Sequence, residues 1–139
     1  SWMVKADLIA NDQWDEITRL CKEAVIKLQG IQLVHVGINT PSEKDAFDVA
    51  EGFAKLGYET LPGNSSVFMG KDIEIMKSMY LGKNGHLAFK CYDVDRTVYF
   101  LKQKGFTVNE STVKYDAKGA MKVAYFNEEI GGFAFHLVK

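Results

Sequence analysis

The sequence has few of the features that mark membrane proteins, nucleic-acid-binding proteins or nucleotide-binding enzymes. No apolar run approaches the roughly 20 residues that span a bilayer, and no signal-peptide pattern opens the chain. Lysine and arginine form no run and the net charge is −1, so nothing predicts a surface for nucleic acid or an anionic membrane. A Gly-rich phosphate loop and a nucleophile-elbow serine are both missing.

Cysteine is also scarce, since Cys21 and Cys91 stand far apart and form no CxxC pair. This usage predicts two reduced, partly buried thiols in a cytoplasmic protein, and a catalytic cysteine is the alternative. Hydrophobic residues make up 47% of the chain and charged residues 25%, which is typical of a soluble globular protein. At 139 residues the chain suffices for one ordinary domain or for two small modules that share a core.

The first thirty residues differ from the rest. Apolar residues recur every three or four positions from Trp14 to Leu28, which predicts an amphipathic helix. Asp12 is the expected N-cap and Gly30 the expected end of this helix. The abrupt start at Ser1 suggests a fragment of a longer chain, and a cloning boundary is the alternative.

The segment "SWMV…DLIA…DQWDEITRLCKEAV" resembles the last strand and closing helix of 2-dehydro-3-deoxy-phosphogluconate / 4-hydroxy-2-oxoglutarate aldolases. The resemblance covers residues 1–30 and rests mainly on Asp15–Leu20 and on the Ser-Trp pair. It implies that Ser1 occupies a substrate-phosphate position and that an aldolase barrel precedes it in the parent chain. The Schiff-base lysine and the glutamate of such a barrel would lie upstream, so aldolase activity would belong to that missing part.

An internal repeat organises the remainder, with one copy in residues 31–84 and the other in residues 85–139. Each copy opens with a strand that contains a histidine and continues into a helix, with Ser42 or Asp93 as its expected N-cap. Each helix ends at a glycine followed by an aromatic residue, and three β-like segments follow. The order strand, helix, strand, strand, strand is therefore expected twice.

Side-chain alternation places one histidine or glutamate of each of four strands on a common face. Successive residues of a strand point to opposite faces, so the apolar neighbours of these residues would pack on the helices. The four residues left on the other face are His35, Glu74, His86 and His136. They include every histidine of the chain and stand at equivalent places in the two copies.

Three imidazoles and a carboxylate are ligands suited to Zn, Ni, Co, Fe or Mn as a divalent ion. A lone strand histidine is usually a hydrogen-bonded polar residue, and an exposed strand glutamate such as Glu74 is common. The equivalent placement of all four favours a divalent metal site in a cleft.

The repeat resembles the vicinal oxygen chelate superfamily, which includes glyoxalase I, extradiol dioxygenases and bleomycin-resistance proteins. The likeness covers residues 31–139 and rests on "HVGI" and "HLAF" at the head of the two copies and on "GFAFHLVK" at the end. It implies an α+β fold in which two βαβββ modules form a curved mixed sheet with a cleft, here preceded by an N-terminal helix. It also implies metal ligands at the four strand positions, where His136 replaces the usual glutamate and leaves Glu74 as the candidate catalytic base.

Three functions fit these residues. The first is a metal-dependent lyase or isomerase that acts on a small 2-oxo acid or sugar-acid metabolite. The second is a non-catalytic sensor or capture domain for such a metabolite, and the third is an oligomerisation module with a vestigial histidine set. The candidate substrate contacts in the cleft are Lys90, Tyr115, Tyr125 and Asn127, each of which is alternatively a solvated strand residue.

Overall fold

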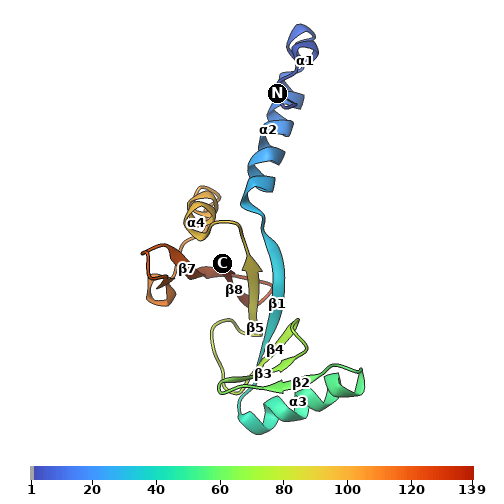
Figure 1. Ribbon diagram of the computed structural model, residues 1–139, viewed down its shortest axis with the longest axis vertical. Coiled ribbons are helices and arrows are strands. Elements are labelled where there is room, and N and C mark those ends of the chain that lie inside the picture. Colours follow the sequence, from blue (N-terminus) through green and yellow to red (C-terminus); the bar gives the residue numbers. More distant parts are fainter. Residues whose placement is uncertain (1) are drawn as a thin grey trace.

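The computed structural model describes residues 2–139 and consists of a sheet domain with a helical extension (Figure 1). The extension comprises the short helix α1 (Ala6–Ala10) and the long helix α2 (Trp14–Gln29). The strand that the aldolase resemblance implies before α2 is wrong for residues 2–13, which contain no strand because Ala6–Ala10 are helical. Ser1, the candidate phosphate contact, lies outside the described residues.

The sheet domain repeats one order of elements twice, as the sequence predicts. The first half comprises β1 (Gln32–Asn39), α3 (Glu43–Lys55), β2 (Thr60–Pro62), β3 (Ser66–Met69) and β4 (Ile73–Met76). The second half comprises β5 (Gly85–Lys90), α4 (Val94–Lys102), the 3₁₀ turn η1 (Glu110–Thr112), β6 (Lys114–Tyr115), β7 (Met121–Ile130) and β8 (Phe133–Val138).

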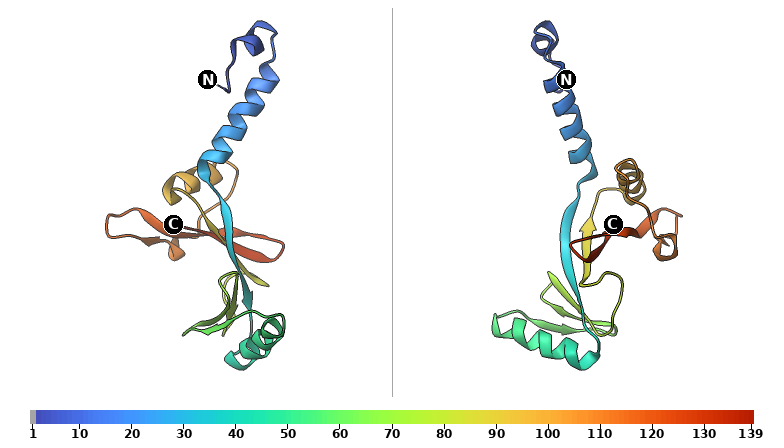
Figure 2. Two further views of the ribbon diagram at one scale, coloured as in Figure 1. Left: turned by 45° about the vertical axis from the view of Figure 1, so that its right-hand side comes forward. Right: turned by 180° about the vertical axis from the view of Figure 1, so that it is seen from behind.

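All eight strands form one mixed sheet in the order β2-β3-β4-β1-β5-β8-β7-β6. Within each half the first strand pairs with the last in parallel, so β1 runs beside β4 and β5 beside β8. The two halves join where β1 pairs with β5 in antiparallel fashion at the centre of the sheet. Figure 2 shows how strongly this sheet twists between its two ends.

Each half has its own helix and its own hydrophobic core. Helix α3 covers the first core, formed by Ala46, Ala50, Val67, Met69 and Ile75. Helix α4 covers the second core, formed by Cys91, Val94, Val98, Val108, Ala124, Phe126, Phe135 and Leu137. These apolar side chains occupy one face of the strands, which leaves the opposite face for the polar residues between them.

Both helices begin at the predicted caps. The side-chain oxygens of Ser42 and Asp93 accept hydrogen bonds from the backbone N–H groups of Asp45 and Arg96, three residues further on. Such bonds satisfy an amide that has no partner within the helix.

Helix α2 projects away from the sheet (Figure 1), and near its C-terminal end Arg96 and Thr97 of α4 donate hydrogen bonds to the carbonyl of Leu28 and the side chain of Gln29. Gly30 ends it in the left-handed conformation, as expected, with φ of 64°. Asp12 is not the N-cap, because its own backbone is left-handed with φ of 51° and Gln13 takes the cap position without a side-chain bond. Several apolar side chains of α2, including Trp14, Val25 and Leu28, are exposed.

The two cysteines are free thiols, with Cys91 in the second core and Cys21 partly buried on α2. None of the helices within residues 2–139 combines the length and the apolar character needed to cross a membrane.

Candidate metal centre

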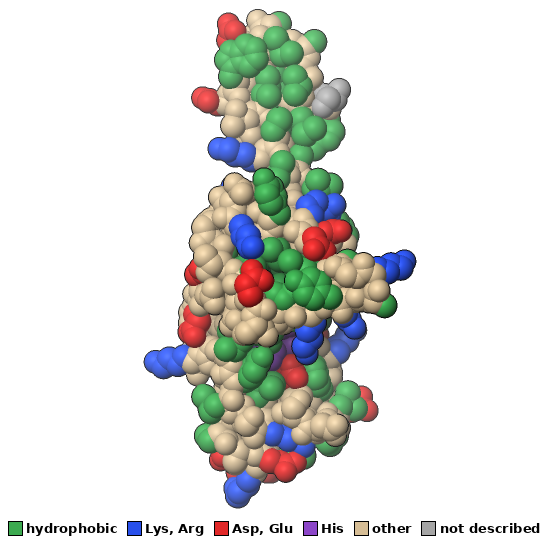
Figure 3. Space-filling view, turned by 90° about the vertical axis from the view of Figure 1, so that its left-hand side faces the viewer, with side chains coloured by type: hydrophobic (Ala, Val, Ile, Leu, Met, Phe, Trp, Pro, Cys, Tyr) green, Lys and Arg blue, Asp and Glu red, His purple; other side chains and the backbone are tan. Residues whose placement is uncertain are grey.

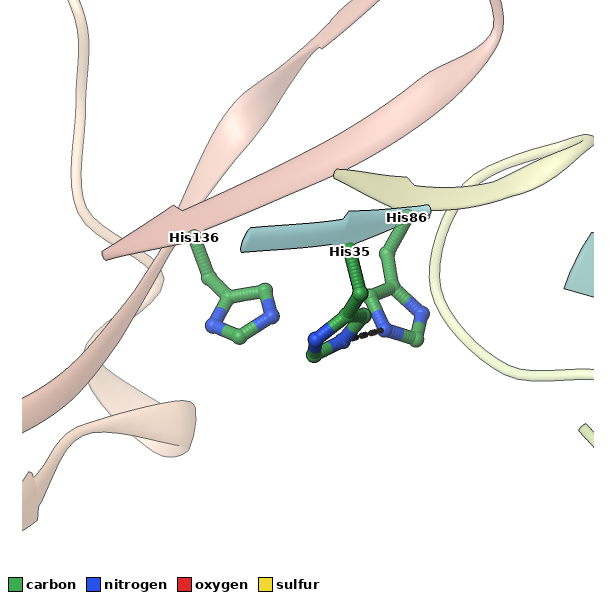
Figure 4. Close-up of side chains that lie close together, drawn as sticks. All are labelled: His35, His86 and His136. Carbon is green, nitrogen blue, oxygen red and sulfur yellow. Dashed lines mark hydrogen bonds between the residues drawn. The ribbon is translucent and has the colours of Figure 1, made fainter. Parts of the chain in front are cut away.

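The strand register brings the four predicted ligand residues together. His35 on β1 lies opposite Ala88 on β5, and Ala88 in turn lies beside His136 on β8. Gly37, two residues after His35, lies between Glu74 on β4 and His86 on β5. All four side chains therefore extend from the same face of the central strands (Figure 4 shows the three histidines).

Gly37 permits the close approach of Glu74 and His86 across β1. A Cβ atom at position 37 would lie 2.1 Å from Cε1 of His86, so the imidazole occupies the space that any other side chain would fill. Because Gly37 has no side chain, the Glu74 carboxylate from β4 and the His86 imidazole from β5 can meet over β1.

Three donor atoms form a close triangle. His35 Nε2 and His86 Nε2 each lie 3.2 Å from Glu74 Oε2, and 3.1 Å from one another. With bonds of about 2.1 Å, neighbouring donors lie about 3.0 Å apart around an octahedral ion and about 3.4 Å apart around a tetrahedral one. Protons cannot serve all three contacts at once, since each Nε2–H can point at only one acceptor. A cation at the centre would satisfy all three donor atoms.

His136 completes the cluster on its other side. One nitrogen from each of the three histidines lies within 4.8 Å of the others. His136 is buried, and within residues 2–139 neither of its ring nitrogens has a hydrogen-bond partner. Buried polar groups are nearly always paired, so this imidazole has a free donor position of the kind that a metal ion takes up. The donor set therefore fits a divalent metal.

Two groups in the cluster have displaced pKa values. Burial alone would raise the pKa of Glu74, but hydrogen bonds from His35, His86 and Ser66 outweigh it and hold this pKa well below its usual range. Burial, together with the neighbouring charges of His86 and His35, lowers the pKa of His136 to about 4. Glu74 is thus ionised and His136 neutral at pH 7, which are the forms that bind metals.

Ser66 orients the carboxylate and was not predicted from the sequence. Its hydroxyl donates a 2.7 Å hydrogen bond to Oε1 of Glu74, which leaves Oε2 directed at the two histidines. Outer contacts of this kind hold metal ligands in position. The available signal was a serine at the start of the otherwise apolar strand "SVFM".

A cleft of about 520 Å³ opens beside His136. Tyr125, one of the predicted contacts, lines this cleft and stacks on the imidazole of His136 with ring centres 4.2 Å apart. Burial, with Tyr80 and Glu74 nearby, raises the pKa of Tyr125, so its hydroxyl keeps its proton. In the space-filling view histidine atoms are visible in a hollow, with basic and acidic side chains beside them (Figure 3).

The other three predicted contacts do not line this cleft. Lys90 ends β5 and borders a separate hollow, because four residues along a strand separate it from His86 by about 13 Å. Asn127 donates hydrogen bonds to Thr107 Oγ1 and to the carbonyl of Val108, at a point where β7 is irregular. Tyr115 is exposed on the short edge strand β6.

The fold of this chain is similar to that of several solved structures. No protein-family model matches the chain, and no curated protein does either. Among solved structures the chain is similar to a hypothetical protein, BH1468, from Bacillus halodurans C-125, with a TM-score of 0.52 and 18% identity over 78% of this chain and 93% of that one.

Two methylmalonyl-CoA epimerases are similar to the same extent. For the enzyme from Mycobacterium tuberculosis the TM-score is 0.51 with 19% identity, over 76% of this chain and 85% of that one. For the enzyme from Streptomyces coelicolor, solved with 2-nitronate-propionyl-CoA, the TM-score is 0.51 with 17% identity, over 77% and 92% of the two chains. At these identities the comparison establishes the fold alone: two βαβββ halves in one curved sheet, the glyoxalase-like fold that the resemblance implies.

Proposed function

We propose that this protein binds one divalent transition-metal ion through His35, Glu74, His86 and His136, and that it acts on a small 2-oxo acid or sugar-acid metabolite. The observation that carries the proposal is the triangle of donor atoms from β1, β4 and β5, with sides of 3.1–3.2 Å. An ion held there would act as a Lewis acid that polarises adjacent oxygens of the ligand.

Glu74 is the candidate proton-transfer group in this proposal. It is the carboxylate of the cluster, and a lyase or isomerase reaction needs a base to move a proton on or off carbon. Ser66 holds Oε1 and the donor triangle includes Oε2, so Glu74 would have to release one of these contacts before it could accept a ligand proton. Tyr125, protonated and at the cleft wall, is placed to donate a hydrogen bond to a ligand oxygen.

Capture of the metabolite without turnover is the second candidate, and the state of Glu74 favours it. Three hydrogen bonds stabilise this carboxylate as an anion, and a carboxylate of low pKa is a poor base. A cleft with a metal and no effective base would bind a metabolite and release it unchanged.

Elemental analysis of protein purified without added metal tests the proposal, after reconstitution with Zn, Ni, Co, Fe or Mn. We expect about one metal ion per chain in the wild type and strong loss in His86→Ala and Glu74→Gln. Glu129→Gln, which removes an exposed carboxylate from β7, is the matched control and should keep the metal. A metal-free wild type after reconstitution would contradict the proposal and would leave an assembly module as the better account.

Turnover separates the two candidates once metal is bound. Consumption of 2-oxo acids or hemithioacetals by the metal-loaded wild type would support catalysis. Saturable binding without consumption would support capture.

We also propose that residues 1–30 are the closing part of an aldolase of the type they resemble. The exposed apolar side chains of α2 support this, because the barrel of such an enzyme would cover them. The test is release of pyruvate from 4-hydroxy-2-oxoglutarate by the natural full-length protein, with a known aldolase as positive control. Absence of pyruvate release would contradict this part.

A further inference from the structure

Among the residues that the structure describes, Lys114 is the basic residue that lines the cleft beside His136, and it is exposed to solvent. The other polar lining groups are mostly hydroxyls, those of Ser65, Ser78, Tyr80, Ser111, Thr112 and Tyr125. In the part of the chain that the structure describes, no aspartate or glutamate lines this cleft. The acidic residues nearest to Lys114 in sequence pair elsewhere, Glu110 with Lys102 and Asp116 with Lys139.

The strand register places Lys114 on the same face as the metal cluster. Lys114 on β6 lies opposite Val123 on β7, and Tyr125, two residues further along β7, lies opposite His136 on β8. Residues that are opposite one another or two apart on a strand share a face, so Lys114 faces the cleft with Tyr125 and His136.

The spacing between Lys114 and His136 leaves room for a short ligand. The two residues are two strands apart, at about 4.8 Å per strand, and are offset by two residues of about 3.3 Å each. Their Cα atoms are therefore about 12 Å apart, and both side chains stand on the same face of the sheet. A ligand that contacts both the metal cluster and Lys114 must span an interval of this order.

We propose that the ligand of this cleft carries a second anionic group, a carboxylate or a phosphate, which binds Lys114 while its 2-oxo acid end lies at the metal cluster. The inference rests on the proposed metal site and adds to it the charge of the ligand. An unpaired ammonium group among hydroxyl donors, with no acidic lining, is a site for an anion. The hydroxyls of Ser65, Ser78 and Tyr80 supply further donors to its oxygens, whereas those of Ser111 and Thr112 already donate to Asn109.

Titration of the Co²⁺-loaded protein, followed by its visible absorption spectrum, tests this inference through binding rather than turnover. The probes are 2-oxoglutarate, 2-oxo-4-phosphonobutanoate and 2-oxopentanoate, which share the 2-oxo acid end and differ in the distal group. We expect the preferred anionic probe to bind about tenfold more tightly than 2-oxopentanoate, because a charge-assisted contact is lost with the methyl group. The preferred anion identifies the distal group as carboxylate or phosphate.

Two variants complete the design. Lys114→Met should bind the preferred anionic probe about tenfold more weakly and 2-oxopentanoate as before. Lys118→Met removes a lysine from the exposed turn that follows β6 and should retain the preference. Equal binding of all three probes by the wild type, or an unchanged preference in Lys114→Met, would overturn the inference. Failure of the protein to take up Co²⁺ would instead overturn the metal site on which it rests.

Discussion

Gly37 sets how closely the ligands from β4 and β5 approach each other. Its missing side chain leaves the space that the His86 ring fills, and the ring would otherwise collide with a Cβ atom at 2.1 Å. The residue is thus part of the site although it donates no atom to it.

Gly37→Ala is expected to weaken metal binding by about 10- to 100-fold, as loss of ligand positioning does elsewhere, because the imidazole must move. Competition with a chelator measures the affinity, and thermal unfolding measures the effect on stability. Gly52→Ala is the matched control: Gly52 lies in α3 with nothing within 4 Å of its would-be Cβ, so the substitution should stabilise the helix by about 0.5–1 kcal/mol and leave metal affinity unchanged. Wild-type affinity in Gly37→Ala would contradict the role assigned to this residue.

Ser66 has a separable effect on the same carboxylate. Removing its 2.7 Å hydrogen bond in Ser66→Ala should raise the pKa of Glu74 towards its ordinary value and free the carboxylate to rotate. We expect a loss of metal affinity of about tenfold. Ser78→Ala, at an exposed serine of the cleft, is the control for loss of a hydroxyl, and equal affinities in the two variants would refute the positioning role.

At the scale of the element, the helix caps and the strand faces follow from local sequence. Ser42 and Asp93 could be predicted as N-caps because each has a short oxygen-bearing side chain and directly precedes an amphipathic run. In the structure each accepts a hydrogen bond from the backbone N–H three residues later. The common face of the four ligand residues followed from the period of two in each strand.

The pairing register of the strands, and the position of each residue along its strand relative to the site, could not be predicted from the sequence. Lys90 shares a face with His86, but alternation says nothing about position along the strand, and Lys90 lies at the far end of β5. Asn127 lies in an irregular part of β7, where side chains do not alternate regularly between the two faces of the sheet. Lys114 and Ser66 belong to the site through neighbouring strands, and such registers are fixed by the whole sheet.

The cap of α3 offers a test that does not involve the cleft. Ser42→Ala should lower the free energy of unfolding by about 1 kcal/mol, because the amide of Asp45 loses its partner at the helix start. Urea denaturation measures the change, and Ser42→Asp should restore most of it. A cap that contributes nothing would leave the midpoint of Ser42→Ala at the wild-type concentration.

At the scale of the whole molecule, the buried His136 makes the metal-free protein sensitive to acid. His136 in the unfolded chain takes up its proton near the ordinary pKa of 6.5, but in the folded protein only near 4. Between these values the unfolded state holds more protons, so the free energy of unfolding falls as the pH falls, by roughly 3 kcal/mol in all. Glu74, whose pKa is also lowered on folding, changes stability in the same direction at still lower pH.

Urea denaturation in the presence of a chelator, at about pH 7 and about pH 4.5, measures this dependence. In His136→Phe an apolar ring that cannot titrate replaces the imidazole. The difference in the free energy of unfolding between the two pH values should therefore shrink by most of the roughly 3 kcal/mol. A dependence that His136→Phe leaves unaltered would assign the acid sensitivity to other groups.

The two halves of the sheet have separate cores and share one seam, the pairing of β1 with β5. His35 and Glu74 come from one side of that seam, and His86 and His136 from the other. An ion bound by all four residues would link the two halves across the β1–β5 pairing, so that neither half could unfold without releasing the ion. The free metal concentration would then decide whether the two halves unfold in separate, loosely coupled transitions or in a single cooperative transition.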